Sequence, residues 1–221
     1  MIKESIYHFL LQLRENNNRE WFQTNKHLYN EAKKDFEEFI ELQIEQTRQI
    51  DPDLAGLRAK DCLFRIFRDV RFSPDKRPYK TNFGAYLAKG GRKSSLAGYY
   101  IHIEPEQSFL GGGVYMPTSP VLKAIRKEIY QSPETFKEIL NNKDFNHHYP
   151  EIWGEKLKTA PRGYPKDWPN LDLIRHKHYA VVKAVSDEQV LNNDFSKLIQ
   201  QSFTALHPFN NYLNHIISPD Q

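Results

Sequence analysis

Six lysine and arginine residues lie within the seventeen positions from Phe64 to Lys80, together with only two carboxylates. The cations are Arg65, Arg68, Arg71, Lys76, Arg77 and Lys80, and the carboxylates are Asp69 and Asp75. The planar guanidinium of arginine binds a carboxylate or a phosphate through two parallel hydrogen bonds, so this segment could bind a small anion. The same charges could instead pair with one another and hold a turn.

Two aspartates cannot neutralise six cations, which favours a bound anion over complete internal pairing. A carboxylate from elsewhere, such as Glu20, Glu31 or Glu104, could narrow this deficit. Pro74 and Pro78 stiffen the segment and fix the directions of its side chains. The candidate ligand-binding residues are Arg65, Arg68, Asp69, Arg71, Asp75, Lys76, Tyr79 and Lys80.

A second candidate group lies in the segment AGYYIHIEP, where strand alternation places Tyr100, His102 and Glu104 on one face. A histidine and a carboxylate two residues apart could be a general base with its orienting acid, or two metal ligands. Glu104 could also simply neutralise an arginine of the basic segment, and the sequence favours this role. His102 and Glu104 are the candidate catalytic residues, although no reaction follows from them.

No residue pattern indicates a metal or a named cofactor. His147-His148 and His176-x-His178 are the paired histidines, and neither has the spacing of a zinc site. The run Gly111–Gly113 lacks the lysine and hydroxyl residue of a phosphate-binding loop, so a bulge or a close backbone approach is the favoured interpretation. We therefore predict no metal site, and the cofactor stays unknown.

The amino-acid composition is typical of an ordinary soluble protein. The chain has 221 residues, of which 39% are hydrophobic and 13% aromatic, enough for one core. Residues 60–93 hold ten Lys/Arg and three Asp, a net charge of +7 in a chain of +3, so the remainder is about −4. The lone Cys62 excludes an intramolecular disulfide, and we see no signal peptide or membrane span. These features predict a cytoplasmic location.

Helical spacing of Ile6, Phe9, Leu10 and Leu13 predicts a first helix, and Asn18 is the expected N-cap of a second. Further helices are expected over 119–130, from 133, and over 193–217 with a kink at Pro208. Residues 141–177 are expected to form a loop.

Alternation and short connections predict antiparallel strands at 62–71, 83–88, 97–104, 108–115 and 178–185. We therefore expect an α+β fold in which a sheet of about five strands is covered by N-terminal and C-terminal helices. Residues 1–221 are predicted to form a single globular domain. It would comprise N-terminal helices (1–50), a sheet-rich middle (60–117) and a mixed helical C-terminal part (118–217).

Several segments resemble an uncharacterised bacterial and fungal family called domain of unknown function 2461. They are NNNREWF at 16–22, FRIFRDVRFSPDKRPYKTNFGAYL at 64–87, YYIHIEP at 99–105, GGGVYMP at 111–117 and LKTAPRGYPKDWP at 157–169. The resemblance extends to about residue 215, and RDxRFSxDKxPYK is its most specific part. It implies no reaction, cofactor or partner. Arg77 departs from the small or hydroxylated residue expected there, which places it outside the inner part of a site.

Two functions remain open. The chain could be an enzyme or binding domain for a small phosphorylated or carboxylated molecule held by Arg65, Arg71 and Lys80. It could instead be a non-catalytic module whose basic surface binds nucleic acid or an acidic protein, with tyrosines available for stacking. Of the two partners we favour the small anion, expect no membrane association, and find nothing that sets an oligomeric state.

Overall fold

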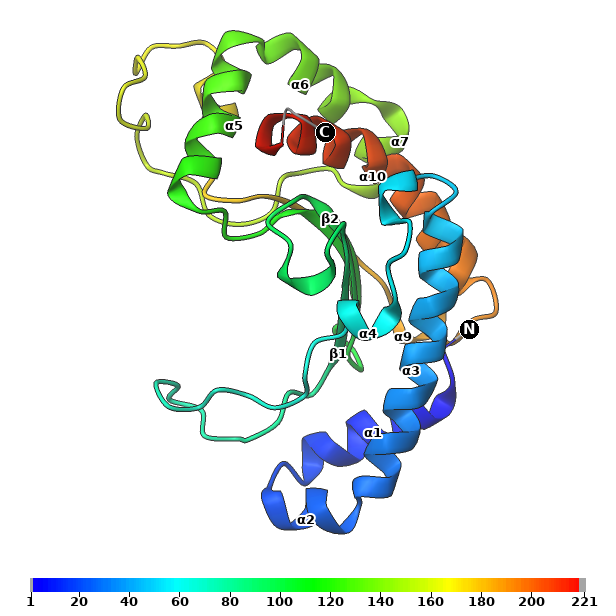
Figure 1. Cartoon of the computed structure of the whole chain (residues 1–221). Helices are drawn as coiled ribbons and strands as arrows, with labels where there is room; N and C mark the ends of the chain where they lie inside the picture. The colour runs from blue at the N-terminus through cyan, green and yellow to red at the C-terminus, as the bar shows by residue number, and fades with distance from the viewer. Residues whose placement is uncertain (1, 219–221) are drawn as a thin grey trace.

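The computed structural model describes residues 2–218 and combines helices with one antiparallel sheet (Figure 1). The strands are β1 (Phe83–Leu87), β2 (Gly98–Ile103), β3 (Phe109–Val114) and β4 (Tyr179–Ala184). The helices are α1 (Glu4–Glu15), α2 (Arg19–Thr24), α3 (Lys26–Thr47), α4 (Ala59–Cys62), α5 (Ser119–Gln131), α6 (Pro133–Asn141), α7 (Lys143–His148), α8 (Leu171–Ile174), α9 (Asp187–Leu191) and α10 (Phe195–Ile217), with short 3₁₀ turns η1 (Pro52–Leu54) and η2 (Gly91–Lys93). The predicted α+β class is confirmed.

The sheet has the order β1-β2-β3-β4, and every neighbouring pair is antiparallel. The prediction of about five strands is therefore wrong, because the sheet formed within residues 2–218 has four. Residues 64–80 make a long loop, here called the basic hairpin, that projects from the edge of the sheet (Figure 1). Its base forms the isolated bridges Leu63↔Ala85 and Phe67↔Tyr79, whose different offsets interrupt a regular ladder.

The two faces of the sheet have different surroundings. Helices α3 and α10 lie on one side, where Tyr99, Ile101 and Leu110 are fully buried (Figure 1). Gly112 also faces this side, and Leu206 of α10 occupies the space that a side chain there would need. His102 is only half-buried on the opposite side, here called the open face.

The N-terminal helices form as the hydrophobic spacing predicts. The expected apolar residues of α1 are buried, and the Asn18 side chain accepts a hydrogen bond from the backbone N–H of Trp21 at 2.9 Å. The Phe83 ring of β1 lies 5.3 Å from the ring of Phe36 and 6.0 Å from that of Phe9, measured between centroids. These contacts dock α1 and α3 on the sheet.

The C-terminal part differs from expectation in one segment. The predicted helices correspond to α5, α6 and α10, and α10 contains Pro208. The loop expected over 141–177 is wrong in part, because α7 and α8 lie within it. Asn142 caps α7 by accepting hydrogen bonds from the N–H groups of Asp144 and Phe145.

Candidate functional site

Three polar side chains form a hydrogen-bonded series on the open face. The Tyr100 hydroxyl lies 3.1 Å from His102 Nδ1, and His102 Nε2 lies 3.0 Å from Glu104 Oε2. This is the set that alternation placed on one face. The side chains of His102 and Glu104 are 14% and 19% exposed, so the series is shielded but still accessible from solvent.

The protons of this series can be assigned from its charges. The hydrogen bond from His102 lowers the pKa of Glu104, which is therefore ionised at neutral pH. An ionised carboxylate only accepts hydrogen bonds, so His102 Nε2 carries a hydrogen and Nδ1 is the ring nitrogen that faces Tyr100. Burial raises the pKa of Tyr100 to about 12, so its hydroxyl donates to Nδ1. Glu104 thus fixes the orientation of the His102 ring.

The chain that leaves the basic hairpin contributes two further contacts. Thr81 Oγ1 donates to Glu104 Oε1 at 2.5 Å, and Asn82 Nδ2 lies 3.4 Å from His102 Nδ1. Glu104 therefore accepts a hydrogen bond on each carboxylate oxygen, from Thr81 and from His102. The sequence had favoured an arginine as its partner.

A lysine of the basic hairpin lies at the edge of the same face. Lys80 Nζ lies 5.6 Å from the centre of the Phe64 ring, and Phe64 in turn packs edge-on against Tyr100 with centroids 6.0 Å apart. Burial lowers the pKa of Lys80, and the neighbouring Arg65 guanidinium lowers it further. A partly buried ammonium with a second positive charge near it favours a bound anion, because the anion would offset both charges.

The turn between β2 and β3 holds Glu104 in place. Ser108 Oγ accepts from the Glu104 N–H at 3.0 Å and donates to the Glu104 carbonyl at 2.9 Å. The Tyr7 hydroxyl lies 3.3 Å from Ser108 Oγ and donates to Asp187 at 3.0 Å. Helix α1 and the start of α9 therefore fix the end of β2.

Arg68 belongs to an ion-pair network inside the basic hairpin. Its Nη1 donates to Asp75 Oδ2 at 2.6 Å and to the Arg77 carbonyl at 3.1 Å, and Nη2 lies 3.4 Å from Ser73 Oγ. Arg77 donates to the same carboxylate at 2.8 Å. Hydrogen bonds from Arg77 and then Arg68 hold the pKa of Asp75 well below its usual range. This network closes the loop.

The outer part of the hairpin carries a second pair. Arg71 Nη2 donates to Asp69 Oδ2 at 2.7 Å, and the Arg71 side chain is 76% exposed. Lys76 Nζ donates to the Val70 carbonyl at 3.1 Å. These residues point to solvent rather than to His102. Arg65 is also exposed, whereas Lys80 is partly buried and approaches the Phe64 ring. That any of them binds a ligand stays a prediction.

Tyr79 lies in the core. Its ring stacks on Phe22 of α2 with centroids 4.0 Å apart, and the residue is 4% exposed. The Asn17 side chain binds both the N–H and the carbonyl of Tyr79, at 3.1 and 3.0 Å. Tyr79 therefore anchors the hairpin to the N-terminal helices.

Sequence reasoning did not select Phe64, Thr81 or Asn82 as site residues. For Asn82 the signal was the alternation Lys80, Asn82, Gly84 that leads into β1. The register Gly84↔His102 then places Asn82 beside the histidine. That register depends on pairing between distant segments.

Across residues 2–218, no three His, Cys, Asp or Glu side chains come together in the way that a metal ion requires. His148 Nδ1 instead lies 2.9 Å from Lys183 Nζ and 3.1 Å from Ser202 Oγ. Burial lowers the pKa of His148 to about 4 and that of His176 to about 4. Both rings are therefore neutral near pH 7.

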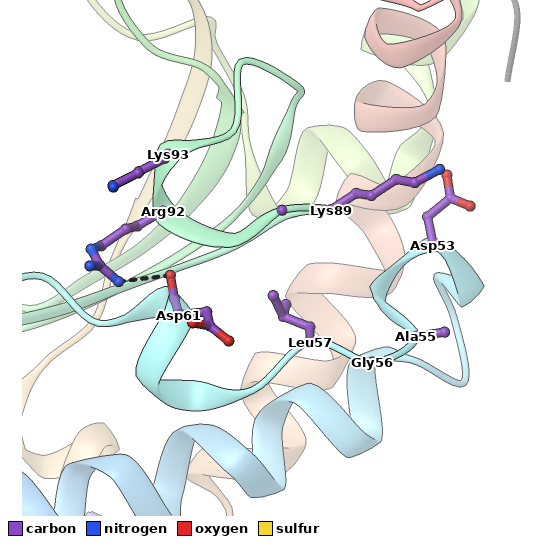
Figure 2. A pocket seen from close by; sticks show the side chains of 9 residues that line it. Asp53, Ala55, Gly56, Leu57, Asp61, Lys89, Arg92 and Lys93 are labelled. Carbon is purple, nitrogen blue, oxygen red and sulfur yellow. Dashed lines mark hydrogen bonds between the residues drawn. The ribbon is translucent and has the colours of Figure 1, made fainter.

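A hollow of about 310 Å³ lies beside the β1–β2 connection (Figure 2). Its lining residues are Asp53, Ala55, Gly56, Leu57, Asp61, Lys89, Gly90, Arg92 and Lys93. Lys89 extends toward Asp53, and Arg92 donates to the backbone carbonyl of Asp61 at 3.1 Å (Figure 2). None of the candidate residues lines it, and its lining includes no histidine, so we place the candidate site on the open face.

Comparison with known proteins identifies the family. A family model described as "Conserved hypothetical protein (DUF2461)" matches residues 5–212. The chain belongs to the DUF2461 family. No curated protein and no solved structure matches it.

The DUF2461 match includes all four strands, the basic hairpin and the three residues of the hydrogen-bonded series. The resemblance found in the sequence motifs is thus confirmed. In residues 2–218 of this DUF2461 chain, no helix has the length and apolar character needed to cross a bilayer.

Proposed function

We propose that the open face binds a small phosphorylated or carboxylated ligand, and that His102 exchanges a proton with it. The observation that carries this proposal is the series Tyr100–His102–Glu104, in which the Tyr100 ring packs against Phe64, the ring that the Lys80 ammonium approaches. A histidine oriented by a carboxylate is a common arrangement for acid–base chemistry.

Each side chain has a distinct role. Lys80 and Arg65 neutralise the anionic group, and Glu104 keeps Nδ1 of His102 free to accept a proton. Tyr100 occupies that position in the free protein, and a ligand hydroxyl or acidic C–H would compete for it. Arg71, which the sequence had placed among the anion-binding residues, is assigned no role here because its guanidinium pairs with Asp69 on the outer part of the hairpin.

The test is a thermal-shift panel of sugar phosphates, nucleotides and dicarboxylates. A ligand at a hundred times its Kd adds about 2.7 kcal/mol, which raises Tm by roughly 5 to 10 °C for a chain of this size. Lys80→Met should abolish the shift, whereas Arg71→Ala should leave it unchanged.

His102→Gln separates binding from chemistry. If His102 transfers a proton, this variant retains most of the thermal shift but loses turnover of the ligand. A panel in which no small anion stabilises the wild type, or in which Lys80→Met responds as the wild type does, contradicts the proposal.

A further inference from the structure

The tip of the basic hairpin exposes a large aromatic side chain. Phe72 is 93% exposed, and the Arg71 guanidinium lies 5.8 Å from the centre of its ring. The hairpin itself projects away from the sheet and helices (Figure 1). An aromatic ring left in water, with a cation on it and cations around it, is a recurring feature of nucleic-acid-binding surfaces.

The charge of the hairpin is strongly positive. Six cations and two carboxylates give residues 64–80 a net charge of +4. The two carboxylates already accept hydrogen bonds from Arg71 and Arg77. Exposed ion pairs of this kind contribute little, so a phosphate can replace a carboxylate at low cost.

The hairpin holds this shape before any partner arrives. Arg68 is bonded to Asp75, Ser73 and the Arg77 carbonyl, and Pro74 lies within the closed loop. At the base, the Tyr79 ring is stacked in the core. Binding to the tip therefore requires little ordering of the chain, which favours affinity.

We propose that this tip binds single-stranded nucleic acid, with Phe72 stacked on a base and Arg71, Lys76 and Arg77 contacting phosphates. Only an unpaired base offers a face for stacking. The hairpin has no helix to enter a duplex groove. The Phe72 ring at the tip is too little apolar surface for a typical protein interface, which buries about 800 Å² per partner. This site is separate from the proposed ligand site on the open face.

Fluorescence anisotropy of a labelled oligothymidylate of about 20 nucleotides tests the proposal. Phe72→Ala should weaken binding about 5- to 150-fold, the loss typical of one stacked base, and Phe72→Trp should restore it. Arg71→Gln should reduce the slope of log affinity against log salt by about 0.7, measured between about 50 and 200 mM salt. Lys127→Gln removes an exposed charge from α5 and should leave affinity nearly unchanged.

The outcomes distinguish this proposal from its alternatives. Because the altered side chains are exposed, the variants should unfold at the wild-type Tm. Equal affinities of wild type and Phe72→Ala would refute stacking. Binding to phosphatidylserine vesicles without binding to the oligonucleotide would assign the tip to a membrane surface instead. Lys80→Met, which tests the open face, should retain Phe72-dependent binding.

Discussion

Thr81 donates a hydrogen bond of 2.5 Å to Glu104, and this contact ties the end of the basic hairpin to the end of β2. The other oxygen of the same carboxylate accepts from His102. The position of the hairpin and the orientation of the imidazole therefore depend on one carboxylate.

Thr81→Val keeps the shape of the side chain and removes this donor. Hydrogen bonds to charged groups contribute about 1.5–3 kcal/mol, so we expect a loss of roughly 2 kcal/mol in unfolding free energy, measured with urea. Thr24→Val is the matched control, because Thr24 is exposed and bonds only to a carbonyl of its own helix. It should change stability by less than about 0.5 kcal/mol. Equal losses in both variants would contradict a special role for Thr81.

Glu104 should make folding stability depend on acid pH. Its folded pKa lies below the ordinary 4.5 because His102 donates to the carboxylate. A lowered pKa stabilises the fold above the unfolded value, and this contribution is lost as the pH falls through the folded pKa. The stability difference between wild type and Glu104→Gln should therefore be full above pH 4.5 and shrink below it. A stability difference between the two proteins that grows as the pH falls would contradict the lowered pKa of Glu104.

Gly84→Ala should separate Tyr100 from His102 while leaving the fold intact. An added Cβ would lie 2.5 Å from the Tyr100 hydroxyl, which is the movable end of a side chain. Nitrogen NMR of His102 should then report loss of the hydrogen bond at Nδ1, with Nε2 still protonated. An unchanged Nδ1 signal would mean that Tyr100 has another position available.

Gly112→Ala is the contrasting variant. Its Cβ would collide with the Gly98 carbonyl, which is fixed in the neighbouring strand, and with Leu206 of α10. Overpacking of this kind costs about 1–3 kcal/mol, so Tm should fall well below that of Gly84→Ala. A wild-type Tm would show that α10 can move away from the sheet.

Cys62 should be inert in the folded protein. It is fully buried at the end of α4, and burial raises the pKa of its thiol to about 12. A thiol reagent such as dithionitrobenzoate should therefore react only as the chain unfolds. Rapid labelling of the native protein would contradict this placement.

The alternation of residues 99–104 was sufficient to predict the central part of the site. Ile101 and Ile103 face the buried side, so Tyr100, His102 and Glu104 had to share the other. The roles of Lys80 and Asn82 could not be derived in the same way. They depend on the register between β1 and β2, and no local pattern specifies it.

The basic hairpin shows where local patterns fail. FRIFRDVRF alternates like a strand, yet Phe67 packs against Phe22 of α2, with centroids 5.9 Å apart. That contact with a distant helix directs the chain away from the sheet edge. The N-cap of α7 was a local signal that was missed, since Asn142 precedes Lys143-Asp144 in the manner of a helix start.

The projecting hairpin also exposes the chain to proteolytic cleavage. Arg71 and Lys76 lie on its exposed part, whereas Tyr79 remains in the core on the far side of the loop. Trypsin acting after Arg71 would leave an N-terminal fragment with α1 to α4 and a C-terminal fragment with all four strands. Phe36 lies in the N-terminal fragment and Phe83 in the C-terminal fragment, and their rings pack in one core. The two fragments should therefore stay associated after cleavage, as the halves of a split protein do when they complement each other.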